Sequence, residues 1–210
     1  MTKNPLLLTF LAIGMAACSA DAPVPTASHM SHGGASLSDL ARADNAQSLA
    51  ALRQFTAKFH DLDAATSAQY GLLVAPPATA VDGCISDPSM GGMGYHYTRG
   101  NNLSDDAIDL LDPEFLVYAP TDGPPVDGVV KRRLAAVEYF LPFTPRWPAP
   151  GAPGFVKVPS LHDFPSTSDL PDVPFTATNR FGGWMFHIWL WENNPAGMFV
   201  NFNNSVPLCL

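Results

Sequence analysis

Nine prolines fall between Pro142 and Pro174 of the 210-residue chain. A proline has no backbone N–H, and its ring fixes φ near about −65°, so it interrupts helices and inner strands. The segment therefore excludes a regular helix and a central strand, and we predict a long ordered or semi-ordered loop that wraps the surface. Regular secondary structure has to come from the residues before and after it.

Residues 37–70 show the spacing of an amphipathic helix. A first apolar series recurs at roughly 3.6-residue intervals, and a second, shorter series ends near Tyr70, where Gly71 fits a C-cap. The helix is expected to cover one face of a sheet. The first series consists of Leu40, Leu49, Leu52, Phe55 and Phe59.

Apolar segments in the rest of the chain predict strands at 94–98, 115–118, 133–141 and 184–191. Two Asp-Gly pairs, at 122–123 and 127–128, separate the second and third segments, so these two are expected to form a hairpin. A further short strand is expected to end at Cys209. The fold class is α+β: an N-terminal amphipathic helix packed on a mostly antiparallel sheet, with the long proline-rich surface loop.

The N-terminal residues predict an export signal. An apolar stretch of about a dozen residues precedes Cys18, whereas a helix that crosses a bilayer needs roughly 20. Met15-Ala16-Ala17-Cys18 resembles the lipobox of bacterial lipoproteins, in which the cysteine becomes the lipidated first residue. We therefore expect a signal peptide at 1–17, a flexible tether at 18–36 and one globular domain at 37–210.

The resemblance also implies a location. Ser19 follows the cysteine where an inner-membrane retention signal usually has Asp, so the outer membrane of a Gram-negative cell is favoured. The diacylated, N-acylated cysteine, with palmitate as its characteristic acyl chain, would anchor the chain stably. Two alternatives stay open: cleavage after Ala20, giving a periplasmic or secreted protein, and a cytoplasmic chain with an apolar start.

The net charge argues against nucleic-acid partners, and the cysteine content bears on disulfide formation. Removal of residues 1–17 takes away Lys3, which leaves 11 − 1 = 10 basic against 19 acidic residues, a net charge of −9. Such a chain is a poor partner for nucleic acids. If Cys18 carries lipid, Cys84 and Cys209 are left as a pair, and an oxidising compartment favours a disulfide between them. A pair of buried free thiols is the alternative.

Three predicted strands each carry one ionisable residue in an apolar setting: His96, Glu138 and His187. An unpaired buried carboxylate is costly, so Glu138 needs a hydrogen-bond donor, a cation or a metal ion. If the three side chains converge, they form a two-histidine, one-carboxylate set that suits divalent Fe, Mn or Zn.

Two other interpretations of these residues stay open. In the first, Glu138 pairs with His187 or with an arginine such as Arg180, and His96 donates to a backbone carbonyl, which gives a purely structural network. In the second, the three residues belong to a metal-free acid–base or ligand pocket. Aromatic residues near them predict a possible ligand pocket or, alternatively, core packing. These are Tyr95, Tyr97, Trp189 and Trp191.

Five parts of the sequence form recognisable blocks: Gly91–Tyr97 (GGMGYHY), Pro113–Tyr118 (PExLVY), Val137–Tyr139 (VEY), His187–Gly197 (HxWxWxxNPxG) and Cys209. These blocks resemble those of a family of uncharacterised bacterial secreted proteins and lipoproteins. The resemblance covers most of the mature domain and implies a single extracytoplasmic domain with a terminal disulfide. It implies no catalytic residue. Phe202 stands where the family pattern suggests Trp.

The sequence thus predicts a non-enzymatic envelope lipoprotein that binds a small ligand or a partner protein. A metal-binding protein or metal-dependent enzyme using His96, Glu138 and His187 is one alternative, and a structural envelope protein is another. The predicted membrane contact is the lipid anchor.

Exchange of Cys18 for serine tests the predicted anchor. Cys18→Ser removes the thiol that receives the lipid, so the protein should leave the membrane fraction and appear in the soluble fraction. Fractionation followed by immunoblotting measures the change. An unaltered membrane fraction in the variant would contradict lipidation at this residue.

Overall fold

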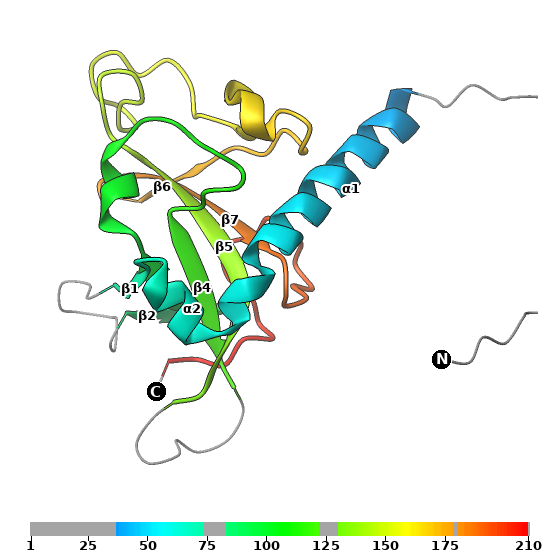
Figure 1. The fold of residues 1–210 in the computed structure, drawn as a ribbon. Coiled ribbons are helices and arrows are strands. Elements are labelled where there is room, and N and C mark those ends of the chain that lie inside the picture. Colours follow the sequence, from blue (N-terminus) through cyan, green and yellow to red (C-terminus); the bar gives the residue numbers. More distant parts are fainter. Residues whose placement is uncertain (1–36, 74–82, 122–129, 179, 210) are drawn as a thin grey trace, which may run out of the picture. The chain divides into compact units, whose positions relative to one another are not determined.

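A computed structural model describes residues 37–73, 83–121, 130–178 and 180–209 (Figure 1). The predicted signal peptide, the tether with Cys18, and both Asp-Gly pairs lie outside these residues. Among the helices that are described, none is long and apolar enough to cross a membrane.

Seven strands form one sheet, and every pairing between the described strands is antiparallel. The order is β1-β3-β4-β5-β7-β6, and β2 also pairs with β3. The predicted hairpin is confirmed, because Leu116 of β4 pairs with Val137 of β5. The strands are β1 (Gly71–Leu72), β2 (Cys84–Asp87), β3 (Gly91–Thr98), β4 (Phe115–Pro120), β5 (Arg132–Pro142), β6 (Thr176–Thr178) and β7 (Gly183–Trp189).

Helical residues precede the sheet, so the protein is of the α+β type. They divide into α1 (Leu37–Thr56), the 3-10 turn η1 (Ala57–His60) and α2 (Leu62–Ser67). The predicted C-cap at Gly71 is wrong: the left-handed residue is Gln69, with φ 69°, and Gly71 already begins β1. A second 3-10 turn, η2 (Gly100–Ser104), follows β3.

Alternation along the strands gives the sheet two different faces. One face joins the helical segment in the main core, where Leu52 and Phe59 pack with side chains such as Tyr139 and Phe186. The opposite face carries two smaller apolar clusters. One contains Val117, Ala136, Trp189 and Val206, and the other contains Phe115, Phe140 and Met185.

Tyrosine hydroxyls fix the loops that cover the main core. Tyr70, Tyr118 and Tyr139 are buried, and each donates a hydrogen bond to a backbone carbonyl, of Pro113 (2.8 Å), Phe59 (2.6 Å) and Leu110 (2.6 Å) respectively. Burial raises the pKa of Tyr70 to about 12. These side chains therefore stay neutral, and their hydroxyls satisfy carbonyls that strands and helices leave unpaired.

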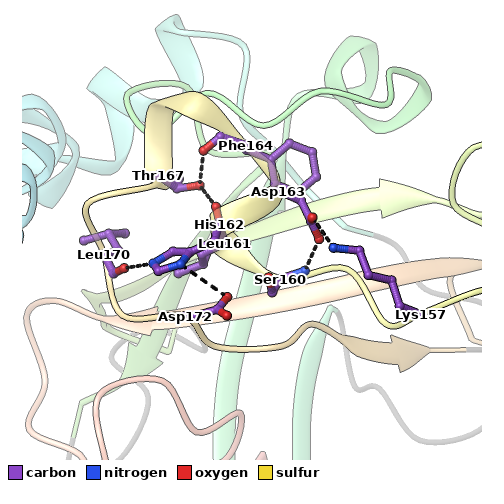
Figure 2. A network of polar contacts seen from close by, with 9 residues as sticks. All are labelled: Lys157, Ser160, Leu161, His162, Asp163, Phe164, Thr167, Leu170 and Asp172. Atoms are coloured by element: carbon purple, nitrogen blue, oxygen red, sulfur yellow. Dashed lines mark hydrogen bonds and ion pairs between the residues drawn. The ribbon is translucent and has the colours of Figure 1, made fainter.

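The proline-rich segment forms no regular strand or long helix before β6, in agreement with the prediction. It contains the short 3-10 turns η3 (Leu161–Asp163) and η4 (Pro165–Thr167), and a polar network holds them (Figure 2). Ser160 and Asp163 form a capping box, and His162 Nε2 donates to Leu170 O at 2.8 Å. The segment is more than a surface wrap, because Leu161, Phe164 and Leu170 are buried in the main core.

The C-terminal segment, residues 192–209, contacts both faces of the sheet: Val206 packs in a small cluster of the opposite face, and Phe199 stacks on Phe186 of the main core. The predicted terminal strand is wrong: only Asn203 forms a bridge, to Gly92. Asparagine side chains replace strand pairing, since Asn194 Nδ2 donates to the carbonyls of Val200 (3.2 Å) and Phe202 (2.9 Å). The segment approaches β3 so closely that a Cβ on Gly92 would lie 2.6 Å from Pro207 O.

Cys84 on β2 and Cys209 stand as a disulfide-capable pair, with Cα atoms 5.8 Å apart. The pairing links the end of the C-terminal segment to the sheet. Cys209 N also donates to Ser86 Oγ at 3.2 Å, so two contacts join this end of the segment to β2.

A second buried carboxylate, which the sequence did not single out, lies just before β4. Glu114 is 2% exposed, and its Oε2 accepts a hydrogen bond from the N–H of Phe140 at 3.1 Å. Burial outweighs this bond and raises the pKa of Glu114 from 4.5 to about 8. The folded protein therefore holds a proton on Glu114 at neutral pH.

This proton makes the stability depend on pH. The unfolded carboxyl ionises near pH 4.5 and the folded one near 8, so stability should fall as pH rises through this window and level off above it. Glu114→Gln is neutral at every pH. Its unfolding free energy relative to wild type should rise by a few kcal/mol, at up to about 1.4 kcal/mol per pH unit, between pH 4.5 and 8.

Urea unfolding at several pH values measures this difference. Glu192→Gln, at a partly exposed glutamate that pairs with Arg133, is the control and should show no such rise. Parallel curves for wild type and Glu114→Gln across the window would contradict a buried neutral carboxyl.

Candidate functional site

The opposite face of the sheet brings together His96, Glu138 and His187, called here the His-Glu-His cluster. Glu138 on β5 pairs directly with His187 on β7, and His96 on β3 reaches Glu138 across β4. His96 Nε2 lies 3.3 Å from Glu138 Oε2, and His187 Nδ1 lies 3.6 Å from Glu138 Oε1. All three side chains are at most 1% exposed. The convergence on which the sequence hypotheses depended is therefore present.

A β-bulge shapes the strand that carries His96. Ile85 pairs with Gly94 and Ser86 with Gly92, which leaves Met93 as an extra residue. Gly94 has φ +114°, and a Cβ there would lie 2.5 Å from Tyr118 O, so only glycine fits. The carbonyl of Gly94 lies 3.0 Å from His96 Nδ1. A carbonyl only accepts, so Nδ1 carries the proton, as the network interpretation predicted.

This hydrogen bond determines which ring nitrogen of His96 faces Glu138. With Nδ1 protonated, Nε2 faces the carboxylate, and two opposed lone pairs would repel each other. A proton or another cation between the two atoms would remove this repulsion. Burial alone raises the pKa of Glu138, but the charge of His96 and the contacts from both imidazoles outweigh it and lower the pKa from 4.5 to about 2. Glu138 is therefore ionised.

His187 is the neutral member of the cluster. Burial lowers its pKa, and the nearby carboxylate only partly offsets this effect. Its ring stacks on that of Trp189, with centroids 4.6 Å apart. His96 is placed similarly, with its ring edge-to-face on Phe115 at 6.0 Å. Aromatic rings from the two small apolar clusters thus hold the two imidazoles in position.

Several buried polar atoms of the cluster lack an aligned hydrogen bond. His96 Nε2, Glu138 Oε2 and both ring nitrogens of His187 have no such partner among the described residues. Both His–Glu distances allow charge attraction, but the His96 contact is not aligned as a hydrogen bond and the His187 contact, at 3.6 Å, is too long for one. Nearly all buried polar groups in proteins are satisfied, so a concentration of exceptions marks a candidate functional site.

A pocket of about 230 Å³ opens beside the cluster, and Glu138 is the cluster member that lines it. This volume exceeds that of a single water, which occupies about 30 Å³, but falls below the roughly 300–1,000 Å³ of drug-sized sites. It suits a small ligand. We call it the Glu138 pocket; its lining is Ile85, Met93, Glu138, Thr176, Thr178, Arg180, Phe181, Met185, Asn201 and Phe202.

A shallower hollow adjoins the Glu138 pocket. The two share Thr176, Asn201 and Phe202, and the hollow extends to Met90 and Val200, which are 47% and 42% exposed. The C-terminal segment therefore forms a wall common to both.

The four aromatic residues predicted for a ligand pocket are not grouped together. Tyr95 and Tyr97 are buried in the main core, with Arg132 stacked on Tyr95 at 3.7 Å. Trp189 lies in a small cluster on the other face, and Trp191 packs against His60. None of the four lines the Glu138 pocket or the adjoining hollow. The core-packing alternative describes their placement better.

A metal centre remains a prediction. As the side chains stand, the described part of the chain contains no group of three or more His, Cys, Asp or Glu residues that could hold a metal ion. The His-Glu-His cluster brings the predicted ligands close to one another, but coordination by one ion would require them to shift.

Sequence reasoning missed most of the pocket lining. Thr176, Thr178, Asn201 and Phe202 come from an edge strand and a loop, and no periodic pattern marks them. One signal was available for Met93, since glycines on both sides of a strand residue indicate a bulge.

Comparisons of the chain with protein-family models, with curated proteins and with solved structures found no match. The resemblance to bacterial secreted proteins therefore stays a prediction, and the case for a function depends on the geometry of the Glu138 pocket.

Proposed function

We propose that this protein is a cell-envelope lipoprotein whose domain binds a small molecule in the Glu138 pocket. One observation carries the proposal: an ionised carboxylate, 1% exposed, lines a pocket and keeps an oxygen without an aligned hydrogen bond. Desolvating such a charge costs several kcal/mol, and apolar replacements often stabilise a protein. A ligand that uses the charge gives a reason for its presence.

The rest of the lining supports the same proposal. Small-molecule sites are mostly apolar, with a few polar groups that fix orientation. Ile85, Met93, Phe181, Met185 and Phe202 supply the apolar surface of this pocket. The threonine hydroxyls and the amide of Asn201 supply neutral polar groups beside the carboxylate.

The charge state favours binding over catalysis. A general acid or base at neutral pH works best with a pKa near 7. The pKa of Glu138 is lowered to about 2, and neither histidine of the cluster lines the pocket. We therefore propose a fixed negative charge for recognition. The lipid anchor and the outer-membrane location are part of this proposal, on the strength of the lipobox-like Cys18.

Thermal unfolding of the full-length protein in detergent tests the proposal. A panel of small amines, amino acids, carboxylates and sugars is added to wild type and to Thr178→Phe, which fills the pocket. At 100 times its Kd, a bound ligand stabilises by about 2.7 kcal/mol, which raises Tm by roughly 5–10 °C. At least one compound should do so in wild type and not in Thr178→Phe.

Thr66→Phe is the matched control, because Thr66 is an exposed threonine on α2 outside the pocket lining. Its response should equal that of wild type. A panel with no active compound, or equal shifts in Thr178→Phe, would contradict binding in this pocket.

Metal binding is a second candidate function, favoured by the hydrogen bond of His96. Metal-bound histidines usually donate their other N–H to a carbonyl or carboxylate, as His96 Nδ1 does to Gly94 O. Ligand atoms around a four-coordinate ion with bonds of about 2.0–2.2 Å lie roughly 3.3–3.6 Å apart. The two His–Glu distances are similar, at 3.3 and 3.6 Å, but each involves a different Glu138 oxygen, and coordination by one ion still requires the side chains to shift.

Elemental analysis tests this candidate. Full-length wild type, His96→Ala and His187→Ala are incubated with Fe, Mn or Zn, desalted and measured. About one ion per chain is expected in wild type and far less in both variants. His162→Ala, in the proline-rich segment, is the control and should keep the wild-type content. Substoichiometric metal in wild type with all three ions would eliminate the candidate.

A further inference from the structure

The charges around the Glu138 pocket are distributed unevenly with depth. Glu138 is almost fully buried, whereas Arg180 is an exposed residue, whose charge water and salt screen. Other lining residues are neutral. Glu138 is therefore the buried charged side chain that a ligand meets inside the pocket.

The imidazoles contact the carboxylate without lining the pocket. His96 Nε2 lies 3.3 Å from Oε2 and His187 Nδ1 lies 3.6 Å from Oε1, and Oε2 keeps no aligned hydrogen bond. Neither imidazole lines the pocket. Glu138 thus keeps acceptor capacity for a donor that arrives from the pocket, and a charged donor gains more than a neutral one in such surroundings.

Side chains around the carboxylate also suit a cation with an apolar part. The faces of aromatic rings attract cations, and thioethers are polarisable and adapt to ligand shape. Phe181 and Phe202 supply the rings, and Met93 and Met185 supply the thioethers. An anion would meet the Glu138 charge without a buried cation from the lining to compensate it.

We propose that the ligand of the Glu138 pocket carries a protonated amine, which pairs with the Glu138 carboxylate while its apolar part packs against Phe181, Phe202 and Met185. This inference rests on the proposed ligand-binding function. The volume of about 230 Å³ limits the ligand to a compact amine, in the size range of a few linked carbon atoms.

Isothermal titration of the full-length protein in detergent, with EDTA to remove metal ions, tests the amine. Three probes of similar size are compared: n-butylammonium, 1-butanol and butyrate. Butylammonium should bind wild type at least about tenfold more tightly than butanol does, and butyrate should bind most weakly. This ranking needs no variant and therefore does not depend on the folding of a mutant.

Two variants then locate the interaction. Glu138→Gln keeps the shape and removes the charge, so the preference for butylammonium over butanol should fall to about one. Glu192→Gln removes a carboxylate that pairs with Arg133 outside the pocket lining, and should leave the preference unchanged.

The outcomes separate this inference from the proposed function. If butanol or butyrate binds as tightly as butylammonium and Thr178→Phe abolishes the binding, the pocket is a ligand site but the amine is wrong. If butylammonium binds equally well to wild type and Thr178→Phe, the proposed function fails as well. An absence of binding by butylammonium overturns the amine inference.

Discussion

Glu138 holds a negative charge almost fully away from water. Such a charge needs partners, and the residues on this face of the sheet are arranged around it. The carboxylate pairs across strands with His187 and reaches His96 two strands away. His96 is fixed in turn by its bond to the carbonyl of Gly94, and that carbonyl is placed by a bulge and a positive φ. The position of His96 beside the buried carboxylate therefore depends on a local strand irregularity.

The covering of this face is equally important, because a carboxylate open to solvent would need no such partners. Residues 192–209 supply the cover, although they form no strand. Val206 packs with Val117 and Trp189, and the indole of Trp189 donates to Val200 O at 2.6 Å. Asn201 and Phe202 of the same segment line the Glu138 pocket. One irregular segment thus both buries the cluster and forms the wall of the candidate site.

The sequence predicted those parts of the structure that depend on local periodicity. Apolar alternation located four strands, the Asp-Gly pairs indicated the hairpin, and prolines excluded regular structure from 142–174. It also placed His96, Glu138 and His187 on strands as possible partners. β6 and the pocket wall were not predictable in this way, because a three-residue edge strand and a loop held by asparagine side chains have no period.

Wrong predictions have similar causes. Gly71 looked like a helix cap because glycine readily adopts a left-handed conformation, yet Gln69 adopts it here and lets β1 begin earlier. The apolar residues near Cys209 resembled a strand, but the segment pairs with β3 at a single bridge, between Asn203 and Gly92, and Val206 packs on the face of the sheet. Local sequence therefore predicts which residues are buried more reliably than it predicts which segments pack against them.

The link between Cys84 and Cys209 has a consequence for the order of assembly. The sheet contains residues that are made long before the covering segment, which is fixed 125 positions after β2. Because Asn201, Phe202 and Val206 come late in the chain, the cluster can be covered and the Glu138 pocket can gain its wall only after the C-terminal segment has docked on the sheet. Dehydration of the charges and completion of the binding site then become a single late step, which an oxidising compartment can lock.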